Sequence, residues 1–337
     1  MLRQYQRALE EQLDHRNLCL TANGTLALQI ALKGLQLEGE VITTPFTFVA
    51  TAHAAVWNRL RPVFADIEPD HYTLDPAAVE AAITPATCAI LAVHVFGHPC
   101  RLEALADVAK RHGLKLIYDA AHAFGVTVRG RSMAHFGDVS AFSFHATKPY
   151  HSIEGGLLAF ADPGLKTTFD RLKNFGIVSE DEIAGLGTNA KMNEFQALMG
   201  LKILPDLPQI VAARSQAARI YRERLAGVPG LRLPPPLPPD CEPNHAYQPV
   251  EIVAGSAPQG RDAVAEDLKK LNVFARRYFH PLLPDCAPYR DAKCGGNLPV
   301  ARRVARQILT LPIHHDLDAD AVHRICDMLI HLLPGTA

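Results

Sequence analysis

Gly24 and Thr25 open the first of three short segments that could carry chemistry. They follow Thr21-Ala-Asn and begin an apolar segment with helical periodicity. Free backbone N–H groups and the positive end of a helix dipole bind anions at such a position. Gly24 would let a ligand approach the backbone closely, and Thr25 could add a hydroxyl. The alternative is an Asn-Gly turn with a simple helix cap.

Asp119 belongs to the second segment, where an apolar run ends in a carboxylate followed by Ala120-Ala121-His122. Ligands of open α/β sheets bind outside the carboxyl ends of the strands. A half-buried carboxylate there needs a cation or several hydrogen-bond donors. The alternative is an aspartate that caps the next helix.

Lys148 ends the third segment, Phe142-Ser-Phe-His-Ala-Thr-Lys, and Glu154-Gly-Gly follows shortly after. A lysine between an apolar strand and a diglycine is expected to be desolvated. Desolvation lowers the pKa of the amine and frees it to form an imine with a carbonyl group. The alternative is an exposed loop lysine.

Together, an anion cup, a carboxylate and a lysine match the requirements of pyridoxal phosphate. The cup would hold the phosphate and Asp119 would keep the pyridine nitrogen protonated. Lys148 would hold the aldehyde and move protons. Phe48, expected early in a helix over 47–58, could lie flat on the pyridine ring. The alternative for Phe48 is a core aromatic.

The elements expected around these residues alternate between strand and helix, which predicts a mostly parallel sheet flanked by helices. Strands are expected at 40–43, 62–66, 88–93, 115–119 and 138–144, and helices at 25–35, 47–58, 76–83 and 102–112. A hairpin is expected at 126–133. Further helices are expected at 165–173 and at 192–225, the second with a break near Pro205 and Pro208.

A stretch with seven prolines, 228–243, can be neither a regular helix nor a central strand. It predicts a boundary between a large domain, 1–227, and a smaller α+β domain, 228–337. In the smaller domain we expect strands at 246–253 and 308–313 and helices at 261–271, 298–307 and 318–333.

The composition fits this class of fold. The chain has 337 residues, of which 48% are hydrophobic and 20% charged, which excludes a disordered, collagen-like or coiled-coil chain. A net charge of −1 does not favour nucleic acid as a partner. The chain has seven cysteines without a CxxC pattern, and it has neither an apolar leader nor an apolar run of 18 residues. These features predict a cytoplasmic protein that does not bind or cross a membrane.

The chain resembles the DegT/DnrJ/StrS-type aminotransferases, which are pyridoxal phosphate enzymes of the aspartate aminotransferase fold, fold type I. The resemblance is carried along nearly the whole chain by NGTLAL (23–28), VITTPFTFVAT (41–51), PVFADI (62–67), YDAAHAFG (118–125), FSFHATK (142–148), EGG (154–156), GTNAKMNEFQALMGL (187–201) and LPIHHDL (311–317). FSFHATK followed by EGG is the most specific of these. The implied large domain has a sheet of the seven-stranded type.

The resemblance also implies roles for single residues. Lys148 holds the cofactor, Asp119 pairs with its pyridine nitrogen, and His122 lies beside its ring. The remaining implied roles are ring stacking for Phe48, phosphate binding for Gly24, Thr25 and Ser143, and, for Asn189, contact with the phosphate of a neighbouring subunit. A homodimer with shared active sites is therefore expected.

The implied reaction is a ping-pong transamination. An amino acid, usually glutamate, donates its amino group, and a keto-sugar carried on a nucleotide accepts it. FHATK with EGG is more similar to members that aminate C4 of a 4-keto-6-deoxyhexose than to the C3 group. We therefore expect a transaminase of the dTDP-4-amino-4,6-dideoxyglucose type, in amino-sugar and lipopolysaccharide synthesis.

Two alternatives stay within this family. Residue 1 already falls in the helix before the NGT segment, so the family's Trp/Asn/Gly-rich segment, which closes over the substrate, is expected to be missing. This keeps open a non-catalytic or regulatory protein that binds pyridoxal phosphate. The enzyme could also act on a UDP-sugar or at C3. Relatives that act as dehydratases carry a histidine where this chain has Lys148.

A third alternative is a metal enzyme. His94, His98 and Cys100 fall within seven residues, and His145, His314 and His315 add potential ligands. Gly97 and Pro99 make the first group a loop, and no complete ligand set has a standard spacing. We therefore expect no metal. Arg276-Arg277 could bind a diphosphate, or could be a solvated pair or a dimer contact.

Overall fold

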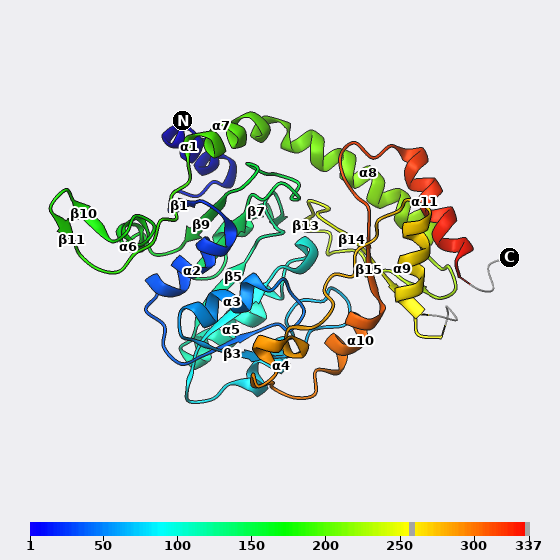
Figure 1. Cartoon of the computed structure of the whole chain (residues 1–337), viewed down its shortest axis with the longest axis horizontal. Helices are drawn as coiled ribbons and strands as arrows, with labels where there is room; N and C mark the ends of the chain where they lie inside the picture. Colours follow the sequence, from blue (N-terminus) through cyan, green and yellow to red (C-terminus); the bar gives the residue numbers. More distant parts are fainter. Residues whose placement is uncertain (256–259, 334–337) are drawn as a thin grey trace.

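The computed structural model describes residues 1–255 and 260–333 (Figure 1). Its centre is a seven-stranded sheet with the order β1-β9-β8-β5-β4-β2-β3. The strands β8, β5, β4, β2 and β3 are parallel to one another, whereas β9 runs antiparallel to both β8 and β1. The expected mostly parallel sheet is confirmed. The strands are β1 (Leu18–Thr21), β2 (Glu40–Thr43), β3 (Arg61–Phe64), β4 (Thr87–Val93), β5 (Lys115–Asp119), β8 (Val139–Ser143) and β9 (Gly156–Phe160).

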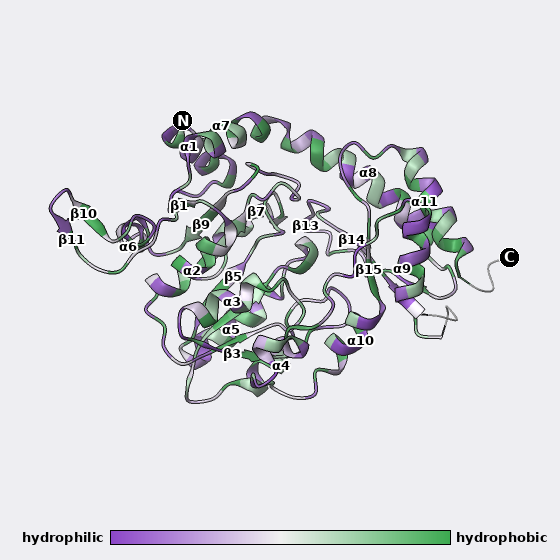
Figure 2. Cartoon of the chain, in the orientation of Figure 1, coloured by the Kyte–Doolittle hydropathy of each residue, from purple (hydrophilic) through white to green (hydrophobic). Residues whose placement is uncertain are grey.

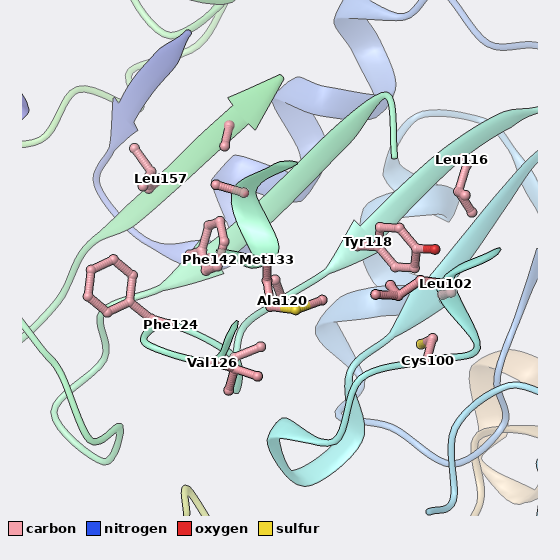
Figure 3. Packing of buried hydrophobic residues seen from close by; sticks show 14 of the residues in the cluster. Cys100, Leu102, Leu116, Tyr118, Ala120, Phe124, Val126, Met133, Phe142 and Leu157 are labelled. Atoms are coloured by element: carbon pink, nitrogen blue, oxygen red, sulfur yellow. The ribbon is translucent and has the colours of Figure 1, made fainter. Parts of the chain in front are cut away.

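Two apolar cores cover the two faces of this sheet. Successive side chains of a strand face opposite sides, so Leu116 and Tyr118 enter one core and Ile117 enters the other. Figure 3 shows Tyr118, Phe142 and Leu157 in the first core. The helices of the first core are α1 (Leu2–Leu13), α4 (Pro76–Ala82) and α5 (Leu102–His112), and those of the second are α2 (Gly24–Gly34), α3 (Ala50–Trp57) and α6 (Leu165–Leu172).

Most of the expected elements are confirmed within two residues, but the start of α3 is a correction. The helix expected from residue 47 begins at Ala50, so Phe48 lies in the loop before it. Pro45 lies in this loop, and the Phe46 N–H donates to Thr44 Oγ1 at 3.1 Å. This local hydrogen bond favours a turn over the first turn of a helix.

A bent pair of helices connects the sheet to the rest of the chain (Figure 1). α7 (Glu194–Ile203) ends in a 3-10 turn, Leu204–Asp206, and α8 (Leu207–Leu225) follows. The break expected near Pro205 is confirmed. Pro208 lies in the first turn of α8, where a missing N–H costs nothing.

The C-terminal unit contains a three-stranded antiparallel sheet with the order β12-β14-β15. Its strands are β12 (Leu231–Arg232), β14 (Gln248–Ile252) and β15 (Ile308–Leu311), and its helices are α9 (Gly260–Lys270), α10 (Pro299–Gln307) and α11 (Ala319–His331). Ala217, Ile220 and Tyr221 of α8 belong to the core of this sheet. The core therefore begins before residue 228, and the domain boundary stays a prediction.

The proline-rich stretch contributes only short edge strands, as its composition requires. β12 is an edge strand, and β13 (Cys241–Glu242) pairs with β6 (Thr127–Val128). β6 and β7 (Arg131–Ser132) form the hairpin expected at 126–133. A further hairpin, β10 (Ile177–Ser179) with β11 (Glu182–Ile183), projects from the body at the left of Figure 1.

The surface helices carry hydrophilic and hydrophobic residues side by side in Figure 2, which is typical of helices with one face on a core. Across residues 1–255 and 260–333, no helix combines the length and the apolar character that crossing a bilayer requires.

Candidate active site

The N-terminus of α2 forms the first part of the site. Asn23 is its cap, and the Asn23 Oδ1 accepts a hydrogen bond from the Leu26 N–H at 2.9 Å. Among the described residues, the N–H groups of Gly24 and Thr25 have no acceptor, so they are available to an anion. Gly24 packs against β8, where an added Cβ would stand 2.7 Å from the Cβ of Ser143. Only glycine fits there without displacing the strand.

Asp119 ends β5 with only 4% of its surface exposed. Its Oδ2 accepts a hydrogen bond from Thr51 Oγ1 at 2.8 Å, and its Oδ1 accepts one from the Ala121 N–H at 3.1 Å. Burial raises the pKa of Asp119, while these two hydrogen bonds and the charge of Lys148 oppose the rise. The carboxylate is thus fixed in position and suited to a cationic partner.

Lys148 lies in the loop between β8 and β9. The loop is closed at its base, where the Phe144 N–H donates to the Gly155 carbonyl at 2.8 Å. Lys148 Nζ lies 3.3 Å from the hydroxyl of Tyr247 and donates to it. Burial lowers the pKa of Lys148 to about 8, and Asp119 opposes this shift. Near neutral pH the amine can therefore exchange its proton far more readily than an ordinary lysine.

His122 lies three residues after Asp119, and its Nδ1 accepts a hydrogen bond from the Phe96 N–H at 3.1 Å. Its ring stacks on Phe279 with the ring centroids 6.1 Å apart. Burial, followed by the charge of Lys148, lowers the pKa of His122, so the ring is neutral. A neutral ring that accepts at Nδ1 carries its proton on Nε2 and can donate it from there.

One cavity of about 470 Å³ brings most of the predicted residues together. Its lining includes Gly24, Thr25, Phe48, Asp119, His122, Ser143 and Lys148. Phe48 is 57% exposed, so it is not a core aromatic, and its ring is free to cover a ligand. Asn189 does not line this cavity. It is exposed, and its Oδ1 accepts a hydrogen bond from Lys191 at 2.8 Å.

Two residues that hold the site were not predicted from the sequence. Thr51 fixes the carboxylate of Asp119, and its hydroxyl lies 2.9 Å from that of Thr47, which lines the cavity four positions earlier in the chain. This spacing within 41–51 was the available signal. Tyr247 contacts Lys148 from the C-terminal unit, 99 positions away, and no sequence pattern singled it out.

The histidines considered as metal ligands make other contacts. His94 Nδ1 accepts from the Cys100 N–H at 3.1 Å, and the His94 ring stacks on Tyr118 at 4.6 Å. His98 Nδ1 lies 3.3 Å from the carbonyl of His71. In the part of the chain that the structure describes, no three His, Cys, Asp or Glu side chains are grouped so that they could hold a metal ion.

The donor set of the cavity fits pyridoxal phosphate. The free N–H groups at the start of α2 suit a phosphate, and the buried carboxylate of Asp119 suits a protonated ring nitrogen. Lys148 supplies an amine of lowered pKa in the same cavity.

Comparisons with known proteins give the same class. The sequence pattern of the DegT/DnrJ/EryC1/StrS aminotransferase family matches residues 1–330. The dTDP-4-amino-4,6-dideoxy-D-glucose transaminase of Shigella dysenteriae is 41% identical over 325 residues, which are 96% of this chain and 88% of that protein. The enzyme of the same name from Escherichia coli is 40% identical over 335 residues, 97% of this chain and 89% of that protein.

A solved structure described as DesI in the presence of its TDP-sugar product is similar to this chain with a TM-score of 0.92 and 39% identity. The superposition covers 98% of this chain and 83% of the chain in that structure. The chain therefore belongs to the DegT/DnrJ/EryC1/StrS aminotransferase family. It is an aminotransferase that depends on pyridoxal phosphate, and its fold is that of the family's solved structures.

Proposed function

We propose that this member of the family transfers the amino group of L-glutamate to C4 of a dTDP-linked 4-keto-6-deoxyhexose. Two relatives at about 40% identity carry the name dTDP-4-amino-4,6-dideoxy-D-glucose transaminase, which supports both the nucleotide and the position. The match extends over at least 96% of this chain in both cases, so it includes the residues of the cavity.

Pyridoxal phosphate, when bound, supplies an aldehyde for the amino group and a ring that accepts electrons. In the proposed site, the N–H groups of Gly24 and Thr25 and the hydroxyl of Ser143 bind the phosphate. Asp119 holds the proton of the ring nitrogen by charge. The uncovered ring of Phe48 lies on one face of the cofactor and excludes water from it.

Lys148 and His122 have the proposed proton-handling roles. With a pKa of about 8, Lys148 can hold a proton at Nζ or release it near neutral pH. The hydroxyl of Tyr247 accepts from that nitrogen and so orients it. His122 stays neutral and presents its Nε2 proton to an oxygen of the cofactor or the substrate.

A homodimer with shared sites completes the proposal, with Asn189 reaching the phosphate held by the partner. Asn189 has no place in the cavity of its own chain. The surface near it carries large exposed apolar side chains, since Trp57 is 77% and Leu186 is 85% exposed, and both line one hollow with Thr188. Exposed apolar patches of this kind mark protein interfaces.

The proposal further places the enzyme in the cytoplasm and its product in lipopolysaccharide synthesis. All seven cysteines are free thiols, which suits a reducing compartment. In the proposal, the chain consists of a cofactor-binding domain, 1–227, and a smaller domain, 228–337. The smaller domain closes the cavity with Tyr247.

The observation that carries the proposal is Lys148, an amine of lowered pKa that shares one cavity with Asp119 and the start of α2. The first test is a visible absorbance spectrum of the protein with pyridoxal phosphate, before and after L-glutamate. We expect a cofactor band that requires Lys148 and that changes with glutamate. Lys148→Ala should remove it, whereas Lys110→Ala, on the surface helix α5, should not.

The acceptor is tested next with dTDP-4-keto-6-deoxyglucose and its UDP counterpart. Turnover with the dTDP-sugar and amination at C4 support the proposal. A missing band would refute the assigned site. Turnover only with a UDP-sugar, or amination at C3, would refute the assigned acceptor.

A further inference from the structure

A second hollow of about 390 Å³ adjoins the cofactor cavity on the other side of Lys148. The two share a wall of five residues: Thr147, Lys148, Tyr247, Arg276 and Tyr278. The lining of this hollow contains cationic and imidazole side chains but, among the described residues, no aspartate or glutamate. We call it the basic bay, and outside the shared wall its cationic and imidazole side chains are Arg214, His151, His314 and His315.

Arg214 stands at the back of the basic bay and is only 5% exposed. It donates to the carbonyls of His245 and Ala246 at 3.2 and 3.4 Å, while its Nε has no partner. Within the described residues no carboxylate pairs with it. Burial lowers its pKa to about 10. A buried guanidinium without a counter-ion is costly, and an anion in the bay would offset that cost.

Arg276 forms the wall between the bay and the cofactor cavity. Its backbone is fixed to β15, because its N–H donates to the Thr310 carbonyl at 3.0 Å and its carbonyl accepts from the Thr310 N–H at 2.7 Å. The guanidinium donates to the Tyr278 hydroxyl at 2.8 Å and has no carboxylate partner in the described part of the chain. Its neighbour Arg277 differs, since it pairs with Asp262 at 3.2 Å.

A short chain of contacts links this guanidinium to the reacting amine. Lys148 Nζ lies 3.3 Å from the Tyr247 hydroxyl, and the rings of Tyr247 and Tyr278 are 6.0 Å apart. The Arg276 guanidinium carbon lies 5.7 Å from the centre of the Tyr278 ring. An anion held by Arg276 is therefore within the reach of a small molecule whose other end is at Lys148.

We propose that the basic bay binds the distal carboxylate of a dicarboxylic amino donor, with Arg276 as its main contact and the donor amine directed to Lys148. The inference rests on the proposed function and adds a basis for the choice of donor. The guanidinium fork matches a carboxylate in geometry and charge. A donor with a neutral side chain would leave Arg276 and Arg214 without a counter-ion, so the site discriminates against it.

The test compares L-glutamate with its neutral isostere L-glutamine in the donor half-reaction of the holoenzyme, followed by the change of the cofactor band. Wild type should prefer glutamate. Arg276→Gln should lower the apparent second-order rate constant for glutamate about 10- to 100-fold and leave that for glutamine within about 3-fold, as expected for loss of one charge-assisted hydrogen-bonding contact. Arg276→Lys should recover part of the loss, and Arg277→Gln is the matched control.

A binding readout separates recognition from chemistry. Calorimetry should detect glutarate, an unreactive dicarboxylate, on the wild-type holoenzyme and a loss of at least about 10-fold in affinity for Arg276→Gln. Unchanged glutamate kinetics and glutarate affinity in Arg276→Gln would overturn the inference. A variant impaired only toward the dTDP-sugar would also overturn it, because the anion would then be the diphosphate. Failure of the proposed function is distinct, since the wild-type band itself would then be missing.

Discussion

Gly24 is the residue of the proposed phosphate cup at which one added carbon should matter most. A Cβ there would lie 2.7 Å from the Cβ and 3.2 Å from the Cα of Ser143, so β8 or the start of α2 must shift. Overpacking of this kind costs about 1–3 kcal/mol. The gain in helix propensity from glycine to alanine is at most about 1 kcal/mol, so it does not offset the clash.

The shift would move the N–H donors of Gly24 and Thr25 relative to the hydroxyl of Ser143. In the proposed site these three groups bind the phosphate together. If the clash is relieved at the expense of phosphate binding, 1–3 kcal/mol corresponds to roughly a 5- to 150-fold loss of cofactor affinity. Titration of the apoprotein with pyridoxal phosphate, followed by absorbance, measures this loss for Gly24→Ala.

Second-site variants identify the cause. Adding Ser143→Gly to Gly24→Ala removes the opposing Cβ and should recover most of the affinity, after correction for Ser143→Gly alone. Adding Ser143→Ala removes only the hydroxyl, keeps the Cβ and should recover none. Wild-type affinity in Gly24→Ala, or equal recovery by both second changes, would refute the steric reasoning.

Four further positions are probed by substitution, namely Lys148, Thr51, Phe46 and Phe48. The pKa of Lys148 in the folded apoprotein is about 8, below its ordinary value of 10.5. Below pH 8 the folded apoprotein therefore bears the full cost of the buried charge. Between pH 8 and 10.5 the folded protein loses this proton before the unfolded chain does, so the stability of the apoprotein rises with pH. Lys148→Met should therefore stabilise the apoprotein at pH 7 by about 3 kcal/mol or less. Urea unfolding at several pH values should show that this gain in stability shrinks towards pH 10.5. A gain that does not change with pH would contradict the assignment of a buried, charged Lys148. Thr51→Val removes the donor to Asp119 Oδ2 and should raise the pKa of Asp119 further. During acid titration this variant should therefore lose cofactor binding at a higher pH than wild type. Thr51→Ser keeps the hydroxyl and should behave as wild type. Phe46→Ala, at a fully buried position, should cost about 3–5 kcal/mol in unfolding free energy. Phe48→Ala should leave stability nearly unchanged but weaken cofactor binding, and wild-type binding by this variant would refute the stacking role.

The elements that could be predicted are those whose pattern is contained in a local stretch. α5 and β5 match the expected ranges because each combines a clear periodicity with a turn signal, such as Gly113 after α5. β1 and β9 were not expected. Each has four or five residues. β9 pairs with β8, which precedes it in the chain, and β1 has a place in the sheet because it pairs with β9, Cys19 opposite Leu158, across more than a hundred positions. No local pattern contains that pairing.

The site residues also divide into those predictable from a local sequence pattern and those that depend on tertiary contacts. Asp119 and Ser143 end neighbouring parallel strands, β5 and β8, so their position at one edge of the sheet follows from the order of the elements. Phe48 is expected in a helix because 47–58 has helical periodicity, whereas the hydrogen bond of the Phe46 N–H to Thr44 Oγ1 favours a turn before Ala50. Tyr247 depends on how the C-terminal unit docks, which is a tertiary property.

Two buried ionisable groups of the cavity, Asp119 and Lys148, explain why the arrangement needs a ligand. Burial raises the pKa of Asp119 and lowers that of Lys148, so each group is held away from its charged form, and each charge opposes the other's shift. In the apoprotein these groups offset one another only in part, and the free N–H groups of Gly24 and Thr25 remain without an acceptor. A phosphate at the cup and a protonated ring nitrogen at Asp119 would satisfy both deficits at once. Cofactor binding should therefore stabilise the fold in proportion to the logarithm of the free cofactor concentration above its Kd. Asp119→Asn should reduce that increment while leaving the apoprotein at least as stable, because it removes a buried carboxylate whose desolvation Thr51, Ala121 and Lys148 offset only in part.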